Sequence, residues 1–108
     1  MVLALAGAAA LVPMPAARAE TLRSQSLEAE LSRHPLSLRA RSGATIAAEQ
    51  VRVVLRRRDG RPIGPEMLRA YAGFAERAAC GRRPALATLM VGAEGGAGHF
   101  DVLCPAAP

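Results

Sequence analysis

The chain has 108 residues, 51% of them hydrophobic, and a formal net charge of +5 at pH 7. This length allows one domain plus a targeting segment and excludes two independent cores. All 14 basic residues are arginine, which is typical of GC-rich bacterial coding, and the positive charge favours anionic partners without specifying one.

Residues 1–19 are predicted to be a secretory signal peptide. The apolar run from Met1 to Val12 is followed by Pro13 and Pro15 and then by a small-residue site at residues 17–19. This run is shorter than the roughly 20 residues that a transmembrane helix needs. We therefore expect cleavage after Ala19, no transmembrane helix in the mature chain, and a periplasmic or extracellular location.

Residues 20–49 are predicted to form a hairpin or a helix, followed by a connector. Alternating apolar runs at residues 27–31 and 36–41 flank a possible turn at residues 32–35, and pairing across this turn would place apolar residues opposite one another. Leu27 and Leu31 also have the i, i+4 spacing of a helix face. A helix from about Leu22 to Arg33, ended by Pro35, is therefore the alternative.

Residues 50–104 are predicted to be the core of the domain. Val51, Val53 and Leu55 alternate with other side chains as in a strand that has one buried face. Gly64 and the proline after it indicate the start of a helix over about residues 65–80, and Gly81 indicates its end. The apolar stripe of this helix comprises Met67, Tyr71, Phe74, Ala75 and Ala78.

Two further strands are predicted at residues 86–91 and 99–104. The glycine-rich residues 92–98 between them are expected to form a flexible hairpin loop, since they match no phosphate-loop motif. Residues 105–108 are expected to be a tail. The predicted fold class is α+β, with one amphipathic helix packed on a sheet of roughly three to five strands.

Cys80 and Cys104 are predicted to form a disulfide, because exported proteins with an even number of cysteines commonly pair them. Closing a loop of this length stabilises the fold by about 3 to 3.5 kcal/mol in the chain-entropy description. The C-x-x-C spacing of redox enzymes is absent from the sequence. The two thiols are therefore assigned a structural role.

Arginines gather at two places in the sequence. Arg56, Arg57, Arg58 and Arg61 precede the predicted helix start, where backbone N–H groups also attract anions. They are the candidate anion-binding residues, and a solvated strand end is the alternative interpretation. The second cluster, residues 82–83, follows the helix.

The sequence contains no recognisable catalytic or metal-binding motif. His34 and His99 lack the close spacing of zinc ligands, and no aromatic side chains alternate with the arginines as in nucleic-acid platforms. We expect no cofactor, no metal and no nucleic-acid partner.

The expected function is a non-catalytic, exported, basic interaction module that contacts an anionic lipid headgroup, a polysaccharide or another envelope protein. An accessory subunit of a protein complex is the alternative, suggested by the low aromatic content. A small hydrolase or redox enzyme is a second alternative, based only on the two histidines and the two cysteines.

Overall fold

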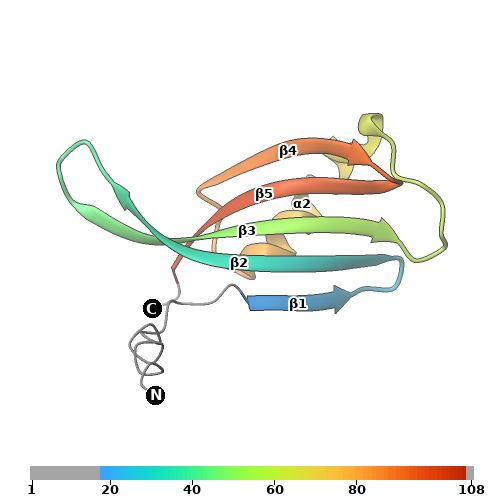
Figure 1. The fold of residues 1–108 in the computed structure, drawn as a ribbon, viewed down its shortest axis with the longest axis horizontal. Coiled ribbons are helices and arrows are strands. Elements are labelled where there is room, and N and C mark those ends of the chain that lie inside the picture. Colours follow the sequence, from blue (N-terminus) through green and yellow to red (C-terminus); the bar gives the residue numbers. More distant parts are fainter. Residues whose placement is uncertain (1–17, 107–108) are drawn as a thin grey trace, which may run out of the picture.

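The computed structural model describes residues 18–106 and confirms an α+β fold. One helix packs on one face of a five-stranded antiparallel sheet whose strand order is β1-β2-β3-β5-β4 (Figure 1). The elements are β1 (Arg18–Arg23), β2 (Leu27–Arg39), β3 (Thr45–Arg57), η1 (Pro65–Met67), α2 (Leu68–Cys80), β4 (Ala87–Glu94) and β5 (Ala97–Pro105).

The segment after the predicted cleavage site forms two strands. Residues 27–39 are one continuous strand, so the prediction of a turn at residues 32–35 was wrong, and so was the alternative of a helix. Leu27, Ala29 and Leu31 are buried on the helix side of the sheet, and this period-two burial favours a strand. Pro35 fits because, within residues 18–106, the pairing of β2 with β1 reaches only Arg33, so no described strand needs a backbone N–H from the proline on that edge.

Strand β3 is longer than the sequence predicted. It begins at Thr45 and includes most of the expected connector, and it pairs with β2 along its whole length, from Thr45 opposite Arg39 to Arg57 opposite Leu27. The far end of this hairpin extends beyond the other strands and curls away from them (Figure 1). The long hairpin therefore holds the centre of the sheet and also projects from one end of it.

The predicted helix is confirmed. Its first turn is the 3-10 element η1, with Pro65 at the first position, and the α-helix ends before Gly81, which has φ of +67°. The buried residues of α2 are Leu68, Ala75, Ala79 and Cys80, and Tyr71 and Phe74 are half-buried beside them. The buried face is thus rotated from the stripe that the sequence analysis chose.

The last two strands form a tight hairpin. Glu94 pairs with Ala97, and the turn is Gly95-Gly96, with φ of +61° and +80°. Two central residues with positive φ match the twist of paired strands, which is why glycines stand there. The expected flexible loop over residues 92–98 was therefore wrong, since most of these residues belong to β4 and β5.

The chain end is held in place as far as residue 106. Pro105 is the last residue of β5, and the Ala106 N–H donates to the carbonyl oxygen of Ala47 at 3.3 Å. These two residues are not the loose tail that was expected, and residues 107–108 lie outside the described part.

The predicted signal peptide falls mostly outside the described residues, which begin at Arg18. Arg18 and Ala19 are the first two residues of β1, so the predicted cleavage site lies within that strand. Neither η1 nor α2 has the length and hydrophobicity required to span a bilayer.

The core lies between α2 and the sheet. Phe100, Val53 and Val51 are fully buried at its centre, and the disulfide between Cys80 and Cys104 joins the end of the helix to β5. The core has few large side chains, so the covalent link is an important part of what holds the helix on the sheet.

Candidate functional site

The structure separates the four candidate anion-binding arginines. Arg56 points to the face of the sheet opposite α2, where its Nη1 lies 3.3 Å from the Oε1 of Glu30. Arg58 donates from Nη1 to the carbonyl oxygen of Ser24 at 2.9 Å. Because consecutive strand residues alternate between faces, an arginine run at a strand end does not converge on one ligand.

Arg57 is engaged with a carboxylate from the adjacent turn. Its Nη2 and Nε lie 2.6 and 3.2 Å from the two carboxylate oxygens of Asp59, and the Arg61 N–H donates to the same carboxylate at 2.9 Å. The hydrogen bond from Arg57, followed by the one from the Arg61 backbone, lowers the pKa of Asp59 below its ordinary value. Asp59 therefore keeps its negative charge at neutral pH.

A cavity of about 370 Å³ opens beside these residues. Its lining includes Arg57, Arg58, Asp59 and Tyr71, together with the turn between β1 and β2. The Asp59 carboxylate offsets one positive charge here, so the field offered to an anion is weaker than the arginine count suggests. Arg61 is the member of the predicted set whose side chain has no hydrogen bond or ion pair within residues 18–106.

Other arginines are more available to an external anion. Along and just after α2, Arg69, Arg77 and Arg82 are exposed, and within residues 18–106 their side chains form no ion pair or hydrogen bond. Arg69 and Arg77 are two helical turns apart and lie on the side of α2 that faces away from the sheet. The signal in the sequence is the position of Arg69 opposite the apolar stripe of the helix, and it is weaker than the run of adjacent arginines near the end of β3.

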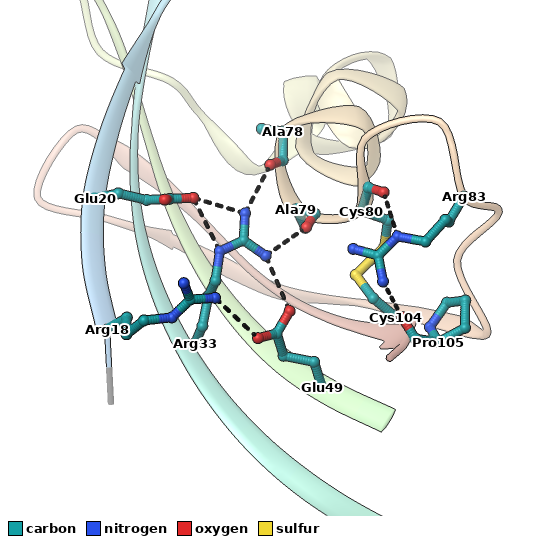
Figure 2. Close-up of polar contacts among 10 residues, drawn as sticks. All are labelled: Arg18, Glu20, Arg33, Glu49, Ala78, Ala79, Cys80, Arg83, Cys104 and Pro105. Carbon is teal, nitrogen blue, oxygen red and sulfur yellow. Dashed lines mark hydrogen bonds and ion pairs between the residues drawn. A yellow bond between two sulfur atoms is a disulfide. The ribbon is translucent and has the colours of Figure 1, made fainter. Parts of the chain in front are cut away.

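The second predicted cluster, Arg82 and Arg83, is split between two roles. Arg83 is partly buried and donates to the carbonyl oxygens of Cys80 and Pro105. It therefore ties the end of the helix to the end of β5 beside the disulfide (Figure 2). Only Arg82 points into solvent.

Arg33 is the centre of a polar cluster between the sheet and the end of α2 (Figure 2). Its Nη2 lies 2.7 Å from Glu20 Oε1, and its Nη1 lies 3.2 Å from Glu49 Oε1 and 2.7 Å from the carbonyl oxygen of Ala79. Arg18 approaches Glu49 from β1 at 3.6 Å. The cluster joins β1, β2, β3 and α2. The guanidinium group of Arg33 forms all these contacts within the domain, so it is not available to an external anion.

The last carbonyl oxygens of α2 are therefore bound by two arginines that lie outside the helix. The last carbonyls of a helix have no partner within the helix and carry partial negative charge. Arg33 donates to the carbonyls of Ala78 and Ala79, and Arg83 donates to that of Cys80. These contacts indicate a structural role for both side chains.

The sheet face opposite α2 is divided into a charged part and an apolar part. Ion pairs cross the strands in the charged part, as between Arg52 and Asp101 at 3.2 Å. The apolar part is a groove of about 450 Å³ beside the projecting hairpin, with Leu36, Leu38, Leu89 and Leu103 among its lining residues. This groove can accept apolar groups, and the charged part is balanced by its own pairs.

The two histidines lie on this same face of the sheet but on different strands. His34 is exposed on β2, and His99 is half-buried on β5. Within residues 18–106, no three His, Cys, Asp or Glu side chains gather in a group that could hold a metal ion. Both cysteines are joined in the disulfide and are buried.

Comparison of the chain with protein-family models, with curated proteins and with solved structures finds no match. The function must therefore be argued from the geometry of the chain itself.

Proposed function

We propose that this chain is an exported, non-catalytic module that binds an anionic lipid surface through the outer side of α2. The observation that supports the proposal is that Arg69, Arg77 and Arg82 lie along and just after α2, are exposed, and have no ion pair within residues 18–106. Arg39 and Arg41, near the tip of the projecting hairpin, are also exposed and unpaired within these residues but lie away from α2. Most other arginines contact a carboxylate or a backbone carbonyl.

Charge and side-chain chemistry both favour such a ligand. The mature chain, without Arg18, has a net charge of +4 that attracts anions over long range, and the planar guanidinium group forms paired hydrogen bonds with phosphate oxygens. Arg61, which precedes η1, would extend the positive surface toward the start of the helix. The opposite sheet face carries balanced ion pairs and is the less attractive surface for an anion.

Export forms part of the proposal. The predicted signal peptide at residues 1–19 directs the chain out of the cytoplasm, and a buried disulfide is consistent with an oxidising compartment. In the periplasm or outside the cell, anionic phospholipid headgroups are available as ligands.

The test is co-sedimentation of the mature chain with vesicles of phosphatidylcholine alone and of phosphatidylcholine mixed with phosphatidylglycerol. We expect binding only to the mixed vesicles, strong at about 20 mM salt and mostly lost at about 500 mM salt, where charges are screened within a few ångströms. Lack of binding to the mixed vesicles at low salt would overturn the proposal. Binding to an anionic polysaccharide but to neither kind of vesicle would show that the ligand is not a lipid, and would overturn it as well.

Matched variants locate the surface. Arg69→Gln with Arg77→Gln removes two exposed, unpaired charges, whereas Arg52→Gln with Arg56→Gln removes two exposed charges that are already paired. Each juxtamembrane arginine contributes on the order of 1 kcal/mol, so the helix variant should bind at least about fivefold more weakly. The control should change less than about twofold, since its charges are already offset by carboxylates. An equal loss of vesicle affinity in the two double variants would show that binding depends only on the net charge of the chain.

The alternative function, an accessory subunit, is favoured by a different observation. Leu86, Leu89 and Val91 are exposed at the β4 edge of the sheet, and such apolar patches commonly mark protein contacts. A mature chain that binds vesicles with no other protein present would support the lipid-binding module over the accessory subunit.

A further inference from the structure

The two edges of the sheet differ in how they are protected against pairing with another strand. Cleavage after Ala19 would leave residues 20–23 of β1, and two of these four are charged, namely Glu20 and Arg23. Residues 85–93, which include most of β4, carry no charge, and Leu86, Leu89, Met90 and Val91 are 40 to 61% exposed there. Edge strands usually carry charges that prevent such pairing, so β4 is the edge left available for it.

We propose that β4 pairs in antiparallel orientation with β4 of a second copy of this chain, so that two five-stranded sheets join into one. This inference goes beyond the binding of an anionic surface and does not depend on it. Two mature copies carry the same net charge of +4, since Arg18 leaves with the predicted signal peptide, and they repel each other where arginines are exposed. The uncharged β4 edge is a surface where that repulsion is weakest and apolar area can be buried.

The sequence of β4 is also complementary to itself. With a two-fold axis at Thr88, Ala87 lies opposite Leu89 of the second copy, and Leu86 lies opposite Met90. Directly opposed residues in an antiparallel pair share a face of the sheet. The Ala87–Leu89 pair, a smaller side chain against a larger one, would lie on the face opposite α2, and the Leu86–Met90 pair would lie on the face that carries α2. The register of β4 shifts between Met90 and Gly92, so this regular pairing would end at Met90.

The apolar groove supports the same arrangement. It adjoins β4, and Ala87 and Leu89 belong to its lining. In a continuous sheet with a two-fold axis perpendicular to it, the two grooves lie on the same face and the two α2 helices lie on the other. Pairing would therefore join two apolar surfaces into one and would present both sets of helix arginines in the same direction.

The test is sedimentation equilibrium of the full mature chain over a range of concentrations. We expect a concentration-dependent dimer, and the substitution Leu89→Arg should weaken it at least about tenfold, because a charge would be placed in an apolar strand pair. Leu22→Arg is the matched control, since Leu22 is 41% exposed on the other edge strand and the substitution adds the same charge. The control should change the dimer constant less than about twofold, because β1 lies away from the joint.

A second variant tests the register without depending on a charge at the edge. Thr88→Cys places one thiol of each copy at the two-fold axis, within the Cβ distance of roughly 5 Å found for opposed strand residues. Under oxidising conditions it should give a covalent dimer whose link maps to position 88 and whose Cys80–Cys104 disulfide is intact. A chain that stays monomeric up to about 1 mM and forms no such link would overturn the proposal. Equal weakening by Leu89→Arg and Leu22→Arg, or occupation of β4 by a different protein while the chain itself is monomeric, would also overturn it.

Discussion

Arg33 shows how one side chain can connect most of this small domain. Its side chain is 11% exposed and contacts two carboxylates and two helix carbonyls. Buried charges are tolerated only when they are paired, and removing one partner leaves the other without compensation. The partners that Arg33 supports are Glu20, Glu49 and the carbonyls at the end of α2.

We expect Arg33→Met to lower the free energy of unfolding by about 2 to 4 kcal/mol, because it leaves the Glu49 carboxylate and the carbonyl oxygen of Ala79 without a donor. Urea denaturation followed by circular dichroism measures the change. Arg23→Met is the control, since Arg23 is 64% exposed and pairs with Glu28 at 3.4 Å. Arg23→Met should lower the free energy of unfolding by less than about 1 kcal/mol. Similar losses in the two variants would show that the Arg33 cluster is no more than a surface ion pair.

The role of Arg33 could not be predicted from the sequence. The partners of Arg33 lie 13 to 46 residues away along the chain, so no local spacing indicates them. The arginine run at residues 56–58 had a clear local pattern, but the pattern did not reveal that alternate residues of a strand point to opposite faces and find separate partners.

At the scale of elements, two glycines, one under α2 and one within it, have different roles. Gly98 on β5 lies under the helix, and a Cβ there would come within 3.0 Å of Leu68 Cδ2 and 3.3 Å of Phe100 Cε1. Gly73 lies within α2, and a Cβ there would meet only the end of the Arg77 side chain at 3.3 Å. The first glycine allows close packing, while the second only weakens the helix.

We therefore expect opposite effects from the same substitution. Gly98→Ala should destabilise the fold by about 1 to 3 kcal/mol, because the buried contact is already tight. Gly73→Ala should stabilise it by about 0.5 to 1 kcal/mol, because alanine has the higher helix propensity and the arginine can move aside. Thermal and urea unfolding of the two variants measure both effects. A stabilised Gly98→Ala variant would mean that the helix is packed less closely on β5.

Elements with strong local signals were predictable, and those that depend on neighbouring strands were not. The start of the helix at Pro65 and its end before Gly81 follow from backbone chemistry alone. The continuation of β2 through Pro35 depends on its pairing with β3, where Pro35 lies opposite Glu49, and local sequence patterns do not show that pairing. For the same reason, Gly92 and Gly98 suggested a loop although they lie within paired strands.

At the scale of the whole molecule, the disulfide closes a loop across a thin core. Its cysteines are 24 residues apart and both are buried. Replacing both, as Cys80→Ala with Cys104→Ala, should lower the free energy of unfolding by about 3 kcal/mol or more, from lost loop closure and lost packing. Denaturation midpoints with and without reductant check this, since the reductant should affect only the native chain. An unchanged midpoint in the double variant would show that the core is sufficient by itself.

The two ends of α2 are held very differently. The disulfide, Arg33 and Arg83 all act on its last turn, whereas its first turn is a 3-10 segment with no side-chain cap. Opening of the helix should therefore proceed from the Pro65 end, with the segment near Cys80 still attached to the sheet. Because α2 would open more easily at its Pro65 end than at its Cys80 end, Arg69 could change its position on a bound surface while Arg77 and Arg82 keep the positions they have in the folded chain.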